Sequence, residues 1–110
     1  MKRRFRLVRS NDFKRVRREG KSFAHPFFVL VIAPSTTENT KAGISISRVV
    51  GNAVTRNRIK RQIRAILNEY LLKMKENWDI LIIVRKNIKM ASFSEIEFTL
   101  LDMFKRSGIK

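Results

Sequence analysis

Residues 51–77 read GNAVTRNRIKRQIRAILNEYLLKMKEN, and the apolar side chains among them recur at steps of three and four residues. This spacing is typical of an α-helix with one apolar side, and it predicts a long helix from roughly Asn52 to Asn77. The residues of the apolar stripe are Ile59, Ile63, Ile66, Leu67, Tyr70 and Met74. The fold therefore depends on which elements the flanking sequence provides to cover this stripe.

Three segments before the long helix have the patterns of one helix and two strands. Ser10, followed by an acidic first turn, and Gly20 predict a short helix over residues 10–19. Residues 23–33 are rich in aromatic and β-branched side chains and predict a strand that is buried on much of both faces. Residues 43–47 alternate apolar and polar side chains, as in a strand with one face on a core. We expect these two strands to pair as a hairpin.

A strand and a helix follow the long helix. Residues 80–84, Ile-Leu-Ile-Ile-Val, predict a short strand of the buried kind. Ser94, with Glu97 three residues later, matches a capping box, and Gly108 stands where a last helix would end. The apolar stripe of this helix comprises Ile96, Leu100, Met103 and Phe104. The order α-β-β-α-β-α predicts an α+β two-layer sandwich, and a length of 110 residues suits a single domain over residues 1–110.

The charge of the chain is its most unusual property. Twenty-five Lys and Arg against nine Asp and Glu leave a net charge of +16, and residues 39–68 hold seven basic residues without one acid. Such an imbalance destabilises the compact state by self-repulsion, which a polyanion relieves. Nucleic acid is the favoured partner, an anionic membrane surface the second and an acidic protein the third. The absence of cysteine excludes a disulfide framework and thiolate zinc sites.

The sequence lacks the patterns of a membrane span and of a secretory signal. Its longest apolar run, residues 27–33, is far shorter than the roughly 20 residues that a span needs. The N-terminus has no apolar signal-peptide core. It is Arg-rich and poor in acids, like an organellar transit peptide, but it continues into the predicted domain without a break. The sequence therefore predicts a cytoplasmic protein.

The polar side of the long helix is the leading candidate for a binding site. At about 100° per residue, four polar side chains fall together opposite the isoleucines, with Arg58 further round. These four are Asn57, Lys60, Arg61 and Arg64. Arg56 lies nearer the apolar side, but in the first turn it can project past the core.

Two features favour anion binding over an ordinary solvated helix face. A solvated face usually alternates Glu with Lys, whereas this one has no acid before Glu69. Its positive charge is also crowded near the helix N-terminus, where the helix dipole disfavours cations. An incoming phosphate would relieve this repulsion, because helix N–H groups and arginine forks both bind it. Arginine can also stack on bases.

The segment GNAVTRNRIKRQIR, residues 51–64, resembles the RNR signature of the protein subunit of bacterial ribonuclease P. The resemblance extends to RLVRSNDFKRVRREGKS upstream, to FFVLVIAP and GISISR before the helix, and to DILIIVRK after it. It implies an α/β sandwich with a left-handed β-α-β crossover around this helix, where the general rule would predict a right-handed one. It also implies that an RNA is the catalyst, since Mg²⁺ ions held by that RNA hydrolyse the 5′ leader from precursor tRNA.

In this family the protein binds the catalytic RNA and the single-stranded leader, and the resemblance implies a heterodimer of one RNA and one protein. The implied RNA-binding residues are Arg48 on the preceding strand and, in the helix, Arg56, Asn57, Arg58, Lys60, Arg61 and Arg64. The leader would lie in a cleft between the first helix and the sheet, where aromatic faces stack on unpaired bases. The positions of this cleft correspond here to Phe13, Arg17 and Val31, with Phe28 close by in sequence. Arg17 and Val31 replace aromatic residues of the family pattern, and core packing stays an equal alternative for Phe13.

The chain offers few groups for catalysis of its own. Metal-free RNA cleavage usually needs two imidazoles or a comparable acid–base pair, and the chain has one histidine, His25, beside Pro26. A magnesium site needs clustered carboxylates, whereas the nine acids are scattered. We therefore expect no catalytic residue, no metal ligand and no cofactor bound by the chain alone. Two interpretations remain, the protein subunit of a ribonuclease P ribonucleoprotein and a structural RNA-binding protein such as a small ribosomal protein.

Overall fold

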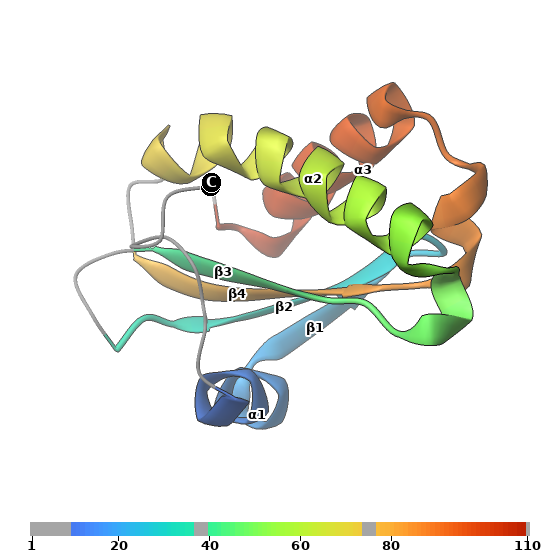
Figure 1. Cartoon of the computed structure of the whole chain (residues 1–110). Coiled ribbons are helices and arrows are strands. Elements are labelled where there is room, and N and C mark those ends of the chain that lie inside the picture. Colours follow the sequence, from blue (N-terminus) through green and yellow to red (C-terminus); the bar gives the residue numbers. More distant parts are fainter. Residues whose placement is uncertain (1–9, 37–39, 74–76, 110) are drawn as a thin grey trace.

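The computed structural model describes residues 10–36, 40–73 and 77–109. Within them a four-stranded sheet of order β1-β2-β4-β3 lies between helices (Figure 1). The helices and strands are α1 (Ser10–Glu19), β1 (Lys21–Ala24), β2 (Phe28–Pro34), β3 (Lys41–Ser45), α2 (Ala53–Tyr70), β4 (Trp78–Val84) and α3 (Phe93–Ser107). Short 3₁₀ helices are η2 (Arg48–Val50), η3 (Leu71–Lys73) and η4 (Lys86–Met90). The predicted α+β class is confirmed, with one strand more than expected.

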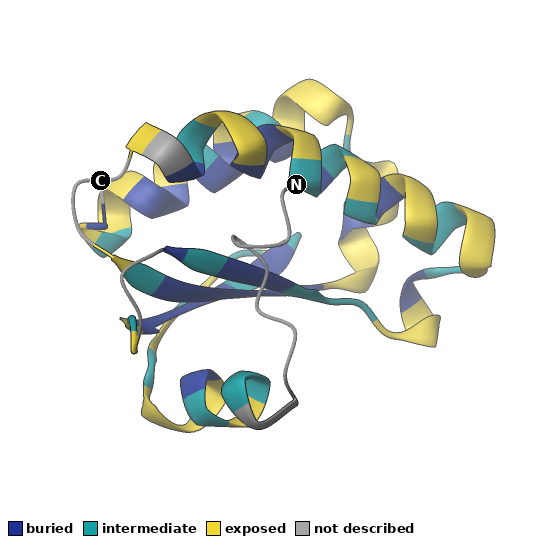
Figure 2. Cartoon of the chain, turned by 60° about the vertical axis from the view of Figure 1, so that its left-hand side comes forward, coloured by how far each residue is buried: buried dark blue, intermediate teal, exposed yellow. Residues whose placement is uncertain are grey.

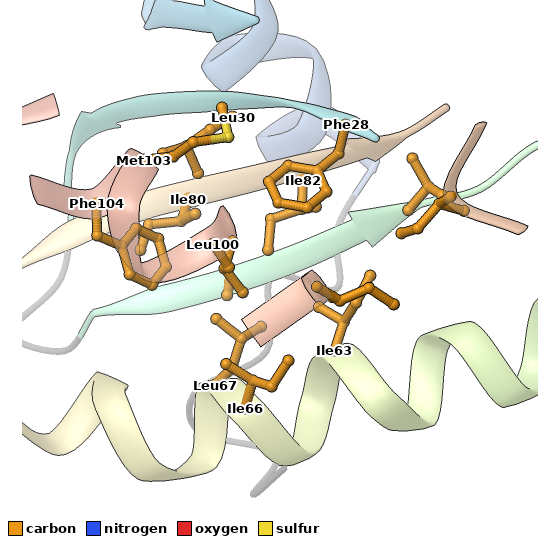
Figure 3. Packing of buried hydrophobic residues seen from close by; sticks show 14 of the residues in the cluster. Phe28, Leu30, Ile63, Ile66, Leu67, Ile80, Ile82, Leu100, Met103 and Phe104 are labelled. Carbon is orange, nitrogen blue, oxygen red and sulfur yellow. The ribbon is translucent and has the colours of Figure 1, made fainter. Parts of the chain in front are cut away.

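The main core lies between the sheet and the helix pair α2 and α3. Leu30 and Ile82 point from the sheet toward these helices, whose inner sides are buried (Figure 2, Figure 3). The predicted stripe of α2 is buried at Ile59, Ile63, Ile66 and Leu67 and half-buried at Tyr70, whereas Met74 lies outside the described residues. The predicted stripe of α3 is buried at Ile96, Leu100, Met103 and Phe104. Each such side chain contributes about 1.5–3 kcal/mol when fully buried, so the core is a major source of stability.

Strand β4 occupies the inside of the sheet because both of its faces are apolar. It pairs antiparallel with β2 and parallel with β3, and β1 pairs antiparallel with β2 at the far edge. Helix α2 connects the parallel strands β3 and β4. Seen from the helix side with both strands pointing upward, β4 lies to the left of β3 (Figure 1, Figure 3). The crossover is therefore left-handed, as the family resemblance implies.

Two predictions about the strands are wrong. The strand expected over residues 23–33 is two strands, β1 and β2, because the chain turns between them. The His25 N–H donates to the Phe28 carbonyl over 3.0 Å, and Pro26 has no N–H to continue a ladder. The hairpin expected between β2 and β3 does not form, because β4 lies between them. Alternation shows which face of a strand is buried but not which strand lies beside it.

Helix α1 covers the opposite face of the sheet (Figure 1). Val16 is buried there against side chains of β2 and β4, and Phe13 packs at the edge of this smaller cluster. At Gly20, which ends the helix as predicted, the chain lies so close to the sheet that a Cβ would be 2.7 Å from the Ile32 carbonyl oxygen. The sheet is thus covered by α2 and α3 on one face and by α1 on the other.

Helix α3 begins earlier than predicted. Its capping box consists of Ser92 and Glu95, whose side chains accept each other's backbone N–H, instead of Ser94 and Glu97. Both pairs have the same spacing in the sequence, so the pattern could not choose between them. The helix ends as predicted, because Gly108 has a φ of 79°, in the left-handed region where a residue without Cβ is favoured.

Candidate nucleic-acid interface

The polar side of α2 faces away from the core (Figure 2). Asn52 caps the helix, since its side-chain oxygen accepts the Thr55 N–H over 2.9 Å. The α-helix ends at Tyr70 and η3 continues to Lys73, short of the predicted end at Asn77. Asn57, Arg58 and Arg61 are exposed, and Lys60 and Arg64 are half-buried. With Arg48 and Arg56, these residues are called the α2 basic surface below.

Two arginines of the α2 basic surface lie at its margins. Arg48 was expected on the preceding strand, but β3 ends at Ser45. Arg48 is instead the exposed first residue of η2. Arg56 is half-buried in the first turn of α2, and its Nε is buried without a hydrogen-bond partner among the described residues. The Nε of Arg56 is therefore covered by neighbouring atoms although Arg56 lies in the first turn.

The α2 basic surface takes part in no ion pair within the described residues. The four ion pairs found there lie within α1, between α1 and β4, and within α3. Helix α2 has five basic residues between Arg56 and Arg64, and its first turn contains no acid. Its cations therefore repel one another at the positive end of the helix dipole. A phosphate-bearing partner would supply the missing negative charge.

A cleft of about 300 Å³ lies between α1 and β3. Phe13, Lys14 and Arg17 of α1 line one wall, and Ile44 and Ser45 of β3 line the other. Lys14 and Arg17 are exposed, while Phe13 is half-buried and also contacts the small core beneath α1. Aromatic faces that stack on bases, together with cations that bind phosphates, are the usual means of holding an unpaired nucleic-acid strand.

The structure brings Phe13 and Arg17 to this cleft but not Phe28 and Val31. Phe28 is fully buried in the main core, on the face of the sheet that α2 and α3 cover. Val31 is buried on the other face, beneath α1. The prediction that these two side chains line the cleft is wrong, because β2 is an inner strand whose two faces are both covered.

Three residues of the cleft were not predicted. Lys14 could have been found, because helix positions that follow Phe13 by one and by four residues lie within about 100° of it. Ile44 and Ser45 carried no such signal, since their place beside α1 depends on the position of β3 at the edge of the sheet. From Ser45 the chain passes through η2 to α2, so two residues separate Ser45 in the wall of the cleft from Arg48 of the α2 basic surface in the sequence.

His25 has a structural role in the turn between β1 and β2. Its Nδ1 accepts the Phe27 N–H over 3.0 Å. Burial, reinforced by the nearby Arg106 charge and opposed by Asp102, lowers the pKa of His25 below its ordinary value. Among the described residues, no group of three or more His, Asp or Glu side chains is placed to hold a metal ion. These observations give His25 a hydrogen-bonding role within the fold.

The fold and the site together define a class of protein: a small, strongly basic α+β protein with a left-handed crossover around a cationic helix. Its cleft lies on the other side of the sheet from that helix, at the edge formed by β3. Over residues 10–36, 40–73 and 77–109, no helix is long and apolar enough to cross a membrane.

Comparison with known proteins identifies the family. The family model described as Ribonuclease P matches residues 1–108. The ribonuclease P protein component of Streptococcus pneumoniae (strain Hungary19A-6) is 39% identical over 109 residues, which cover 99% of this chain and 89% of that protein. The chain belongs to the ribonuclease P protein family. The resemblance drawn from residues 51–64 is thereby confirmed.

Solved structures of similar proteins have the same fold. The ribonuclease P protein of Staphylococcus aureus aligns with a TM-score of 0.89 at 30% identity, covering 96% of each chain. The ribonuclease P protein of Thermotoga maritima aligns with a TM-score of 0.82 at 30% identity, covering 92% of this chain and 96% of that one. The arrangement of strands and helices described above is therefore that of the family, while the RNA contacts of individual residues stay predictions.

Proposed function

We propose that this chain is the protein subunit of a bacterial ribonuclease P ribonucleoprotein, which removes the 5′ leader from precursor tRNA. The observation that carries the proposal is the α2 basic surface, whose cations have no ion-pair partner within the described residues. The relative in Streptococcus pneumoniae is named a ribonuclease P protein component, which supports the same role. In this proposal the chain provides binding surfaces and the RNA provides the chemistry.

The α2 basic surface would bind the catalytic RNA. Phosphates of a folded RNA would lie against Arg58, Lys60 and Arg61, where they replace the negative charge that α2 lacks. Arginine forks bind phosphate oxygens through two parallel hydrogen bonds, so the contact is directional as well as electrostatic. Asn57, exposed on the same side of the helix, adds a neutral donor and acceptor.

The cleft between α1 and β3 would hold the leader. Phe13 presents an aromatic face, and Lys14 and Arg17 place positive charge beside it. Stacking holds unpaired bases without reading their sequence, which suits leaders that differ from one precursor to the next. Because Ser45 in the wall of the cleft lies three residues before Arg48 of the α2 basic surface, one chain could contact the catalytic RNA and the leader of a bound precursor together.

The chain itself would contribute no catalytic residue. The Mg²⁺ ions of the reaction would be held by the RNA, since the carboxylates of the described residues form no cluster that could hold a metal. Bringing two RNAs together crowds their phosphates, and protein cations reduce that repulsion in place of added metal ions. The stimulation should therefore be largest at low Mg²⁺. In this proposal one protein binds one RNA, and the complex acts in the bacterial cytoplasm.

The proposal is tested by leader cleavage of precursor tRNA by a bacterial ribonuclease P RNA at low Mg²⁺, with and without this chain. We expect stimulation at a near-stoichiometric amount of protein. The double variant Arg58→Ala and Arg61→Ala should lose it and should bind the catalytic RNA about tenfold or more weakly, because two charge-assisted contacts are removed. Lys21→Ala with Lys105→Ala removes the same charge from exposed positions outside α2 and should behave like the unchanged chain.

Two outcomes would redirect the proposal. Tight RNA binding without stimulated cleavage would favour a structural RNA-binding protein, and the α2 basic surface would then bind a different RNA. If the α2 double variant kept its full affinity for the catalytic RNA, the assignment of the α2 basic surface would be wrong.

A further inference from the structure

We propose that Arg15 and Asp79 are positioning residues, which hold α1 at the distance from β3 at which the cleft accepts an unpaired RNA strand. The inference rests on the proposed function of the cleft. It concerns two residues that do not line the cleft themselves.

Arg15 connects α1 to β4, one of the two inner strands of the sheet. Its Nη2 donates to Oδ2 of Asp79, the second residue of β4. Asp79 is only 2% exposed, and its other oxygen, Oδ1, is buried without a hydrogen-bond partner among the described residues. Asp12 lies 4.0 Å from the same guanidinium but belongs to α1, so it cannot attach the helix to the sheet. Asp79 therefore depends on Arg15, because removing that partner leaves a buried charge uncompensated.

The other attachments of α1 are small. Among the side chains of α1 that the structure describes, Val16 alone is fully buried, and it packs on a minor cluster with Val31, Ala33 and Leu81. Half-buried Phe13 packs at the edge of the same cluster. Apolar contact is non-directional, so these two side chains leave the rotation and the tilt of α1 loosely fixed. A directional ion pair between a planar guanidinium and a carboxylate does restrict both. The orientation of α1 therefore depends on Arg15.

The same ion pair links the two walls of the cleft. Phe13 and Arg17 share the side of α1 that lines the cleft, and Arg15, about 200° away from each around the helix, points to the sheet. Asp79 is paired in register with Lys41 of β3, and the same ladder continues to Ser45 in the opposite wall. Each wall is thus fixed to β4, one through Arg15 and one through backbone hydrogen bonds.

Loss of the ion pair should affect the cleft and not the α2 basic surface. The main core lies on the other face of the sheet and includes neither Arg15 nor Asp79. A displaced α1 would therefore leave α2 in place. This difference separates a positioning role from a general loss of folding.

Two measurements on the full chain test the proposal. The first is the affinity of the reconstituted holoenzyme for precursor tRNA with a leader, relative to mature tRNA, together with the affinity of the protein for the catalytic RNA. The second is the distance between spin labels attached at Glu19→Cys in α1 and at Ser47→Cys beyond β3. The chain has no natural cysteine, so the labels attach at these two positions alone. The variants are Arg15→Met, Asp79→Asn and Arg15→Lys, and Arg18→Met is a control that removes the same charge from an exposed position of α1.

We expect Arg15→Met and Asp79→Asn to lengthen or broaden the label distance. Their preference for leader-bearing substrate should fall about tenfold, the size expected when a base loses its stacking contact, with catalytic-RNA affinity kept within about twofold. Arg15→Lys should be intermediate, and Arg18→Met should match the unchanged chain. An unchanged distance and preference in both variants, or an equal loss of both affinities, would overturn the proposal. If the unchanged chain showed no leader preference, the proposed role of the cleft would fail, while the distance would still decide whether Arg15 positions α1.

Discussion

At the scale of single residues, the turn between β1 and β2 shows how His25 serves the fold. Pro26 cannot continue a strand ladder, and the ring of His25 accepts the Phe27 N–H through Nδ1. The His25 carbonyl oxygen accepts a hydrogen bond from the Arg85 side chain over 3.2 Å. A protonated imidazole cannot accept the Phe27 N–H, so folding favours the neutral ring, in the same direction as the lowered pKa of His25.

We expect the protein to lose stability as the pH falls through the range in which His25 takes up a proton. Because folding lowers the pKa of His25, the unfolded chain binds this proton more tightly. The contribution is therefore complete above the unfolded pKa of about 6.5 and is lost as the pH falls through the folded pKa below it. Urea unfolding between about pH 7.5 and about pH 5.5 measures the slope. His25→Asn should flatten it, whereas an equal slope in the variant would assign the effect to other groups.

At the scale of elements, the close approach of α1 to the sheet determines the cleft. Gly20 allows this approach, because a Cβ there would lie 2.5 Å from the Val16 carbonyl oxygen and 2.7 Å from the Ile32 carbonyl oxygen. Both contacts are with backbone atoms, which cannot rotate away as a side chain could. Any larger residue at this position must therefore displace α1 or open its last turn.

We expect Gly20→Ala to destabilise the protein by about 1–3 kcal/mol, the usual range for an overpacked site. Leader affinity should fall more than affinity for the catalytic RNA, because α1 moves while α2 does not. Gly108→Ala is the matched control: no atom lies within 4 Å of its added Cβ, so only the left-handed backbone, with a φ of 79°, opposes the change. That variant should lose about 1 kcal/mol and keep its leader affinity. Urea unfolding and RNA binding measure both effects, and a Gly20→Ala protein as stable as the unchanged chain would contradict this account of the close contact.

At the scale of the whole molecule, the net charge of +16 opposes the folded state that the core stabilises. Few ion pairs offset it within the described residues, and none of these lies on α2. A bound RNA would neutralise the charge and release its own counterions. Folding and RNA binding should therefore respond to salt with opposite signs.

We expect added salt to raise the thermal unfolding midpoint of the free chain, because screening reduces its self-repulsion. The same salt should weaken RNA binding, with the logarithm of the affinity falling linearly with the logarithm of the salt concentration. Arg61→Ala should reduce that slope by about one, because one exposed phosphate contact is removed. Lys21→Ala, at the far edge of the sheet from β3, should leave it unchanged. A slope near zero would contradict nucleic-acid binding through the α2 basic surface.

The features that could be predicted from the amino acids are those contained within one element. The apolar stripes of α2 and α3 and the left-handed Gly108 each depend on the spacing of a few neighbouring residues. The α2 basic surface is predictable for the same reason, because the helical repeat alone places its side chains opposite the isoleucines. Family membership follows from residues 51–64, a contiguous and position-specific segment.

The arrangement of strands and the walls of the cleft were decided by packing between distant segments. Hydrophobic burial is non-directional. The apolar faces of β2 therefore predict that this strand is buried, but not that it pairs with β4 instead of β3. The period of two places Phe28 and Val31 on opposite faces of β2, but it could not tell which helices cover each face. The cleft forms where α1 and β3 are each fixed to β4, and no local pattern specifies that meeting of three segments.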